Sequence, residues 1–330
     1  MALILSRSDV QRCLTMPEAI QAMREAFGAL HRRQAQMPQR LAVGLPEQGT
    51  ALLMPSLLQT AEDEAFSLKV ITVMPHNSLR GLPALHASVL LLDATTGRTE
   101  AILEGGWLTA MRTGAVSGLA TDLLAREDAN VLALFGAGAQ APTQLIAIDA
   151  VRPLREVRVV NRSDAHYDQL VKTVHSMLGE QSPAIRRAAS ATEALEGASL
   201  VACATTTTTP LFTRRDIEPG THINAVGAFT PEMCEVDPET VAHARIVVDQ
   251  REAALAEAGD LLQPLAAGRI SGSETWSELG ELVAGAKPGR QNEDEVTLFK
   301  SVGLAVQDLA VAAQVYRNAR QLGVGIEVEI

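Results

Sequence analysis

The segment Gly136-Ala137-Gly138-Ala139-Gln140-Ala141 has the GxGxxA pattern, in which small residues let the backbone turn tightly and approach phosphate groups. It follows the apolar run Val131–Phe135 and precedes residues 140–150, which we expect to be helical with Pro142 in the first turn. The N–H groups at the start of such a helix bind phosphates. An ordinary glycine-rich turn is the alternative, but the flanking strand and helix favour a dinucleotide site containing Gly136 and Gly138.

The end of the next apolar strand indicates which dinucleotide would bind. The sequence there is Val160-Asn161-Arg162-Ser163, whereas NAD sites usually place an acidic residue at this point for the ribose hydroxyls. A guanidinium favours the 2′-phosphate of NADP(H), and NAD(H) remains possible. Two alternatives stay open: Arg162 could stack on adenine or point to solvent, and Asp164 could weaken the preference.

Two other segments end predicted strands in the same half of the chain. They are the threonine run Thr205–Thr209 and Val226-Gly227-Ala228. Ligands of doubly wound sheets bind at the carboxyl ends of the strands, so both segments should border the cofactor. For the threonine run, a plain polar loop is an equally open interpretation.

Three cations precede this half of the chain in distinctive settings. Arg40 ends Met37-Pro38-Gln39-Arg40, Lys69 lies inside the apolar strand Phe66–Ile71, and Arg112 follows Trp107–Met111 at the expected start of a helix. A lysine inside a strand could be an edge lysine that discourages further strand pairing. An arginine at a helix start could simply be solvated.

The composition explains why a few placed cations matter. The chain has 330 residues, with 28 Lys+Arg against 39 Asp+Glu, a formal net charge of -11, and only six Phe, two Tyr and two Trp. Phosphate-rich partners need a basic face, and base stacking needs aromatic side chains. We therefore expect no nucleic-acid or membrane partner, and an anionic ligand must be bound by local cations.

The cysteines and histidines suggest no disulfide framework and no metal site. Cys13, Cys203 and Cys234 are widely spaced, which indicates reduced thiols and a cytoplasmic protein. The N-terminal apolar run is too short for a signal peptide, and no apolar run approaches the ~20 residues of a membrane span. The seven histidines show no ligand spacing, and we expect His76 and His86 to be structural.

The first half of the chain is predicted to position the cations on an antiparallel sheet. Residues 2–5 read as a strand, and Thr15-Met16-Pro17-Glu18 is a capping box that begins a helix. β-rich apolar segments then follow one another, separated by Gly, Pro and Asn, with a turn at Asp93–Gly97. These segments are 41–44, 50–54, 66–73, 86–92 and 99–103.

The second half alternates apolar strands with helices, which predicts a parallel, doubly wound sheet. A long helix is expected over about residues 297–321, followed by a half-buried strand over 324–330. The other expected strands are 131–135, 157–160, 199–204, 222–227 and 245–249, with helices over 140–150 and 164–178.

Several motifs in order along the chain resemble those of the ornithine cyclodeaminase/μ-crystallin family. The resemblance spans nearly the whole sequence. Its motifs are Gly81-Leu82-Pro83, Leu108–Ala115, Gly136–Gln140, Gly227–Met233 and Leu298–Gly303. It implies an α/β chain in which residues 1–119 and 303–330 form an α+β substrate-binding and dimerisation domain with an antiparallel sheet. Residues 120–302 would form a Rossmann-type dinucleotide-binding domain, and the protein would be a homodimer.

The resemblance also assigns residues to sites. By position, Arg40, Lys69 and Arg112 match the residues that hold a substrate carboxylate beside the nicotinamide, and cations of these types form a good carboxylate clamp. Lys69 is the candidate catalytic residue. The residues expected at the cofactor, some from the strand ends and some from the resemblance, are Arg112, Thr113, Gly136, Gly138, Ala139, Gln140, Asn161, Arg162, Thr205, Val226, Gly227 and Ser301.

Two departures from the cyclodeaminase pattern bear on the substrate. Cyclodeaminases carry Glu where this chain has Leu52, and Asp where it has Phe229. Those acids handle the amino groups of ornithine, and an unpaired second ammonium in a closed site would be costly. We therefore expect an NAD(P)H-dependent reductase of a cyclic ketimine, Δ1-pyrroline-2-carboxylate or Δ1-piperideine-2-carboxylate. An ornithine cyclodeaminase is the less favoured alternative. Trp107, Phe229 and Met54 are expected either to line the pocket or to pack in the core.

Other functions remain open from the sequence alone. An alanine-type or opine-type amino-acid dehydrogenase would use the same carboxylate clamp and a nicotinamide cofactor. A non-catalytic NADP(H)-binding protein of the μ-crystallin kind would also keep Arg40, Lys69 and Arg112. Turnover with candidate substrates separates these possibilities.

Overall fold

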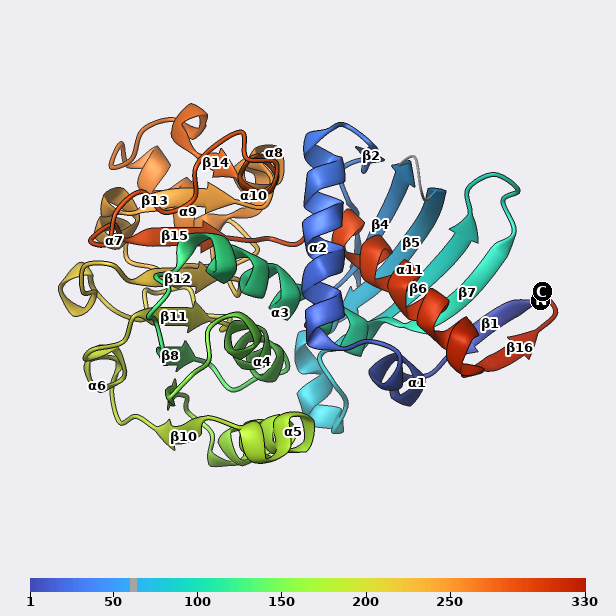
Figure 1. Cartoon of the computed structure of the whole chain (residues 1–330), viewed down its shortest axis with the longest axis horizontal. Helices are drawn as coiled ribbons and strands as arrows, with labels where there is room; N and C mark the ends of the chain where they lie inside the picture. Colours follow the sequence, from blue (N-terminus) through green and yellow to red (C-terminus); the bar gives the residue numbers. More distant parts are fainter. Residues whose placement is uncertain (60–63) are drawn as a thin grey trace. The chain divides into compact units, whose positions relative to one another are not determined.

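The computed structural model describes residues 1–59 and 64–330, which divide into two compact units (Figure 1). One unit contains Met1–Arg112 and Leu304–Ile330, and the other contains Thr113–Gly303. Helix α3 (Gly105–Leu124) begins in the first unit and continues into the second. We describe each unit by itself.

The first unit is built on a largely antiparallel sheet, as the sequence predicted. Its strand order is β16-β1-β7-β6-β5-β4-β2, and β3 pairs with β4. The strand β1 joins the sheet parallel to β7 and antiparallel to β16. The strands are β1 (Ala2–Leu5), β2 (Ala35–Gln36), β3 (Leu41–Leu45), β4 (Gly49–Gln59), β5 (Glu64–Val73), β6 (Leu85–Asp93), β7 (Thr99–Glu104) and β16 (Ile326–Val328).

One face of this sheet is covered by helix. The helix α11 (Ala305–Leu322) crosses β4, β5 and β6 and packs against α2 (Met16–His31), as Figure 1 shows in red and blue. The expected capping box begins α2, because Thr15 N–H donates to Glu18 Oε2 at 2.9 Å and Glu18 N–H donates back to Thr15 Oγ1 at 3.4 Å. The unit also contains α1 (Arg7–Arg12) and a short 3-10 helix, Pro75–Arg80.

The opposite face of the sheet carries a continuous apolar surface. Because side chains alternate along each strand, the register places Ile4, Ile102, Leu90, Leu68 and Pro55 in one row across five strands. All five are partly exposed in the single chain. Neighbouring rows add further apolar side chains: Leu41, Leu53, Leu57, Phe66, Val70 and Leu92.

The second unit is built on a fully parallel sheet, which confirms the predicted doubly wound α/β class. Its order is β10-β9-β8-β11-β12-β15-β13-β14, so the direction of strand succession reverses between β8 and β11. All residues of β8, β11, β12 and β15 are buried. The strands are β8 (Val131–Phe135), β9 (Glu156–Val160), β10 (Ala184–Arg187), β11 (Leu200–Cys203), β12 (His222–Ala225), β13 (Arg245–Val248), β14 (Ser277–Glu278) and β15 (Thr297–Lys300).

Helices connect these strands. The two that the sequence predicted are α4 (Ala141–Val151) and α5 (Asp164–Leu178). The others are α6 (Ala191–Leu195), α7 (Pro238–His243), α8 (Arg251–Glu257), α9 (Gly259–Ala266) and α10 (Leu279–Val283), with short 3-10 helices at Gly179–Gln181, Arg214–Asp216 and Ser273–Thr275.

Three expectations about the elements were wrong. The single helix over 297–321 is a buried strand, β15, followed by α11, because Thr297–Lys300 pairs with β12 on one side and β13 on the other. Arg112 lies in the interior of α3 and not at its start. The C-terminal strand β16 is only Ile326–Val328 and is mostly exposed, since it pairs with β1 at the sheet edge.

Candidate functional sites

Lys69 is fully buried on the helix-covered face of the first unit's sheet. It lies in β5 between Met54 on β4 and Val89 on β6, and both neighbours are apolar. Lys69 is therefore not the edge lysine that the sequence left as an alternative. An ammonium in such surroundings needs a counter-ion, because the cost of losing water is not recovered otherwise.

That counter-ion is Asp308, which sequence analysis missed. Lys69 Nζ donates to Asp308 Oδ1 at 2.8 Å, and neither side chain is exposed to solvent. Burial lowers the pKa of Lys69 to about 8, Asp308 opposes this decrease, and Arg112 and Arg40 add to it. Asp308 is on α11, which brings a carboxylate from the end of the chain to a strand near its start.

Arg112 is held by the same helix. Its Nε lies 3.3 Å from Asp308 Oδ1, and its Nη1 donates to Gln307 Oε1 at 2.7 Å. Arg112 is only 8% exposed. One carboxylate oxygen thus bridges two cations from different elements, β5 and α3.

The structure brings Lys69 and Arg112 together, and the charge of Arg40 is near enough to act on Lys69. Arg40 is partly exposed and directly precedes β3. The cluster of Arg40, Lys69, Arg112 and Asp308 carries three positive charges and one negative charge. We call these four residues the cation cluster. An excess of positive charge in buried surroundings is suited to an anionic group such as a carboxylate.

Apolar side chains surround the cation cluster. Met54 and Leu52, on β4, lie on the same face of the sheet as Lys69, on β5. Met54 packs with Ile71 and Ala305. Leu52 packs against the same apolar cluster. Trp107 is 7% exposed and lies under Arg7, whose Cζ is 5.4 Å from the ring centroid. His76 and His86 are exposed.

The second unit contains the expected glycine-rich turn between β8 and α4. Gly136 has a positive φ of 99°, and an added Cβ there would lie 2.6 Å from the Ala204 carbonyl oxygen, so only glycine fits. Nothing lies within 4 Å of a Cβ built on Gly138, so the backbone there is open to approach. Ala141 is fully buried at the helix start. These features fit the pyrophosphate of a dinucleotide.

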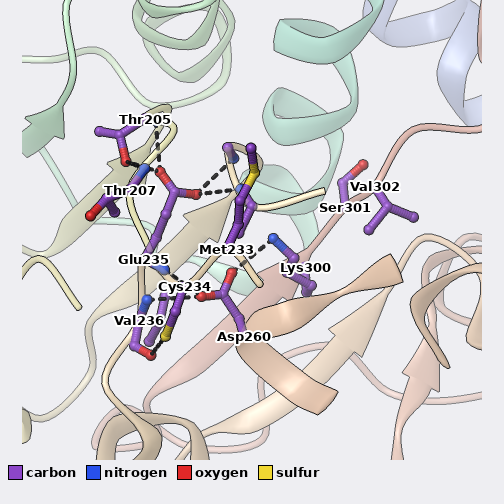
Figure 2. Close-up of polar contacts among 12 residues, drawn as sticks. Thr205, Thr207, Met233, Cys234, Glu235, Val236, Asp260, Lys300, Ser301 and Val302 are labelled. Atoms are coloured by element: carbon purple, nitrogen blue, oxygen red, sulfur yellow. Dashed lines mark hydrogen bonds and ion pairs between the residues drawn. The ribbon is translucent and has the colours of Figure 1, made fainter. Parts of the chain in front are cut away.

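The two other strand ends beside this turn are tied together by Glu235 (Figure 2). Its Oε1 accepts from the N–H and hydroxyl of Thr205, at 2.7 and 2.8 Å, and its Oε2 accepts from the N–H groups of Gly227 and Ala228, at 2.7 and 3.0 Å. Burial raises the pKa of Glu235, whereas the Lys300 ammonium lowers it. Glu235 therefore fixes the loops after β11 and β12 to each other.

Glu235 is itself held by a second buried pair. Asp260 accepts from the N–H groups of Glu235 and Val236, at 2.6 and 3.0 Å, and its other oxygen lies 2.8 Å from Lys300 Nζ (Figure 2). Asp260 and Lys300 are fully buried. Sequence reasoning missed this network, because Lys300 had been placed on a helix.

Ser301 follows β15 and is oriented by Asp249. Asp249 Oδ2 accepts from the Ser301 hydroxyl at 2.9 Å and from the N–H groups of Val302 and Gly303, at 2.8 and 2.9 Å. Because its proton points to Asp249, the Ser301 oxygen can only accept a further hydrogen bond. A carboxamide N–H would be a suitable donor.

The end of β9 carries more positive charge than the sequence suggested. Arg162 is exposed, and Asn161 donates from its side-chain amide to the Ser163 carbonyl. Asp164, which from its sequence position could weaken the preference for the 2′-phosphate of NADP(H), is ion-paired with Arg187 at the end of β10. Arg187 also donates to the Asn161 carbonyl at 3.1 Å.

The parallel sheet places most expected cofactor residues at one edge. The segments after β8, β9, β11, β12 and β15 all leave from the carboxyl ends of adjacent strands, and they carry Gly136–Gln140, Asn161–Arg162, Thr205, Val226–Gly227 and Ser301. Thr113 instead lies on α3, where its carbonyl accepts from Gln144 Nε2 at 3.0 Å. Phe229 is partly exposed in the loop after β12.

Within residues 1–59 and 64–330, no helix is long and apolar enough to cross a membrane. The same residues contain no cluster of three or more His, Cys, Asp or Glu arranged to hold a metal ion. The three cysteines are buried and free.

Known proteins resemble this chain in both sequence and structure. The model of the ornithine cyclodeaminase/mu-crystallin family matches residues 1–323. A Δ1-pyrroline-2-carboxylate reductase of Bacillus cereus is 37% identical over 329 residues, covering 99% of each chain. The structure of the Thermococcus litoralis Δ1-pyrroline-2-carboxylate reductase in complex with NADH and L-proline superposes with a TM-score of 0.93 at 39% identity, covering 99% of this chain and 100% of that one. An archaeal alanine dehydrogenase dimer with bound NAD gives a TM-score of 0.89 at 33% identity, covering 99% of each chain.

Proposed function

The chain belongs to the ornithine cyclodeaminase/mu-crystallin family, and we propose that it reduces a cyclic ketimine carboxylate with NAD(P)H. The substrates would be Δ1-pyrroline-2-carboxylate or Δ1-piperideine-2-carboxylate, and the products L-proline or L-pipecolate. The observation that carries this proposal is the cation cluster, in which Lys69 and Arg112 are buried beside one shared carboxylate. The similarity to two Δ1-pyrroline-2-carboxylate reductases supports the choice of substrate class.

In this proposal the cation cluster binds the substrate carboxylate. Arg112 Nε faces Asp308 and its Nη1 is bonded to Gln307, so Nη2 is the nitrogen proposed to bind the ligand. Arg40 supplies a second guanidinium from the segment before β3. The cluster has a net positive charge, which the carboxylate of a bound substrate would partly neutralise. This favours binding of an imino acid over an imine that has no carboxylate.

Lys69 is proposed to orient the substrate and to supply a proton. Reduction of a C=N bond adds a hydride to the carbon and a proton to the nitrogen. Bound NAD(P)H supplies the hydride and is oxidised to NAD(P)+. The Lys69 ammonium gives its proton to the substrate nitrogen and becomes a neutral amine. With a pKa of about 8, Lys69 can act as an acid near neutral pH without holding its proton too strongly.

The apolar surroundings of Lys69 favour a substrate without a second charge. Leu52, Met54 and Ile71 offer no carboxylate to a distal ammonium. Ornithine would leave its second amino group unpaired against these side chains, at a cost that a five- or six-membered imine ring avoids. Cyclic ketimines therefore fit beside these apolar side chains better than diamino acids do.

The second unit is proposed to bind the cofactor at the strand ends described above. Gly136 and Gly138 fit a pyrophosphate, and Ala139, Gln140, Thr113, Thr205, Val226 and Gly227 are proposed contacts around it. The fixed acceptor oxygen of Ser301 is proposed to receive the carboxamide of the nicotinamide. We further propose a preference for NADP(H), because Arg162 is exposed at the end of β9 and Asp164 is paired with Arg187. The Thermococcus relative was solved with NADH, so the preference needs its own measurement.

The protein is proposed to act as a homodimer in the cytoplasm. The apolar face of the antiparallel sheet needs a cover, and a second copy of the same face would supply it. The archaeal alanine dehydrogenase relative is a dimer. Three buried free thiols suit a reducing compartment.

The experiment that tests the function is a substrate panel with both cofactors. It contains the two cyclic ketimines, ornithine, and pyruvate with ammonia. Turnover of a ketimine with the highest kcat/KM supports the proposal. Pyruvate with ammonia as the best substrate would instead assign an alanine-type dehydrogenase, which the similarity to the archaeal enzyme makes the second candidate. Tight NADPH binding with no turnover would indicate a non-catalytic binding protein.

A further inference from the structure

The chain uses lysine sparingly, and two of its lysines are fully buried. Only four of its 28 basic side chains are lysines, Lys69, Lys172, Lys287 and Lys300, and the rest are arginines. Lys69 and Lys300 have no exposure, and each lies 2.8 Å from a buried aspartate. A lysine can lose its charge at accessible pH, whereas an arginine cannot. Lys69 is therefore the one cation of the cluster whose charge can change during a reaction.

Asp308 is placed to control that charge. Its Oδ1 contacts both Lys69 Nζ and Arg112 Nε, and among the described residues its Oδ2 accepts no hydrogen bond. It is fully buried on α11, so water does not screen its charge. A carboxylate in this position stabilises the ammonium of Lys69 and separates it from the guanidinium of Arg112.

We propose that Asp308 is the positioning residue that keeps Lys69 protonated and directed for proton transfer in the reduction. This inference rests on the proposed function for the transfer itself. The control of Lys69 by Asp308 is a property of the unliganded protein and can be measured without turnover.

The groups around Lys69 determine the direction of the effect. Its strand neighbours Met54 and Val89 are uncharged, and the charged groups that act on it are Asp308 from α11, Arg112 from α3, and Arg40 from the segment before β3. Asp308 is the one of these that favours the ammonium. Its removal would leave a buried lysine facing two guanidiniums, and the pKa of Lys69 would fall well below its value of about 8.

The test uses protein labelled with ¹³C at the lysine Cε, whose chemical shift reports protonation of the adjacent amine. Four lysines give four signals, and Lys172→Arg, Lys287→Arg and Lys69→Arg assign them. In the unaltered protein the Lys69 signal should titrate near pH 8. In Asp308→Asn the midpoint should move down by at least ~1 pH unit. The high-pH limb of kcat/KM for the ketimine should move down by a similar amount.

Two further variants keep the test decisive. Gln307→Glu adds a carboxylate beside Arg112 and should move the Lys69 midpoint upward, so the inference does not depend on Asp308→Asn alone. Glu47→Gln removes an exposed carboxylate of the same unit, which is paired with Arg80 at 2.6 Å, and should leave the Lys69 signal in place.

The outcomes separate this inference from the proposed function. Opposite shifts of the Lys69 midpoint in Asp308→Asn and Gln307→Glu support control by Asp308, even if the unaltered protein reduces no ketimine; in that case the proposed function alone fails. An unchanged midpoint in both variants overturns the inference, including when activity falls, because Asp308 would then have only a structural role.

Discussion

Thr205 donates both its N–H and its hydroxyl to the same carboxylate oxygen of Glu235, at 2.7 and 2.8 Å. The other oxygen of Glu235 accepts two N–H groups from the loop after β12. A single buried side chain thus sets the distance between two strand-end loops. The shape of the proposed cofactor site depends on Glu235, although this residue is not itself expected to contact the dinucleotide.

Glu235→Gln should therefore weaken both stability and cofactor binding. A glutamine has one acceptor oxygen in place of two, so donors now paired with the second oxygen would face an NH2 group. Each buried donor without a partner costs ~1–3 kcal/mol, and two donors face each oxygen, so the expected loss is about 2–6 kcal/mol. Thermal unfolding and NADPH titration measure the two effects. Glu239→Gln, at an exposed carboxylate of the same unit, should change neither. Equal behaviour of the two variants would contradict the role of Glu235.

Lys69→Ala should remove ketimine reduction and spare cofactor binding. Loss of a positioned proton donor typically costs ~10²–10⁴-fold in rate. Lys69 is not among the residues proposed to bind the dinucleotide, so the dissociation constant for NADPH should stay within about twofold. Stopped-flow reduction and fluorescence titration measure the two quantities. Activity retained in this variant would exclude Lys69 as the proton donor.

Arg162→Ala should lower the affinity for NADPH and leave that for NADH nearly unchanged. A charge-assisted hydrogen bond to the 2′-phosphate is worth ~1.5–3 kcal/mol, which corresponds to a loss of about 10–100-fold. The comparison of KM for the two cofactors, before and after the change, isolates the phosphate contribution. Arg215→Ala, at an arginine in a 3-10 helix of the same unit, is a suitable control. A parallel loss for both cofactors would instead place Arg162 at the adenine or the shared phosphates.

Leu68→Glu should disrupt the proposed dimer. Leu68 lies in the middle of the apolar face, between Leu90 on β6 and Pro55 on β4. In the proposed dimer, a glutamate at this position would be buried without an oppositely charged partner. Light scattering coupled to size exclusion should report a dimer for the unaltered protein and a monomer for the variant. Thr72→Glu lies on the same face nearer its margin, beside His86, and should have a smaller effect. A monomeric unaltered protein would refute the dimer directly.

Much of the fold could be predicted because local patterns and long-range structure agree. Val131–Phe135 is uniformly apolar and forms a fully buried strand. The turn after it begins at Gly136, a position where only glycine fits. The capping box at Thr15 and Glu18 forms as expected. Lys69 drew attention because a charge inside an apolar strand needs a reason, and the structure supplies a buried ion pair.

The remainder could not be predicted because it depends on partners far apart in the chain. Asp308 lies 239 residues from Lys69, and nothing in its local sequence distinguishes it from a solvated helix residue. The prediction was wrong at Lys300 as well. Thr297–Lys300 was predicted as the start of a helix, whereas it is a strand inside the sheet, where Asp260 neutralises Lys300. Glu235 and Asp249 were missed for the same reason, since their function is to bind backbone N–H groups of other loops.

The most direct measurement of the central claim is the rate of NADPH or NADH oxidation with Δ1-pyrroline-2-carboxylate and Δ1-piperideine-2-carboxylate, with formation of the L-amino acid measured in the same reaction. The account predicts stoichiometric conversion of at least one of them to L-proline or L-pipecolate, with a higher kcat/KM than for pyruvate with ammonia. No conversion of either ketimine by a folded protein that binds the cofactor would contradict it.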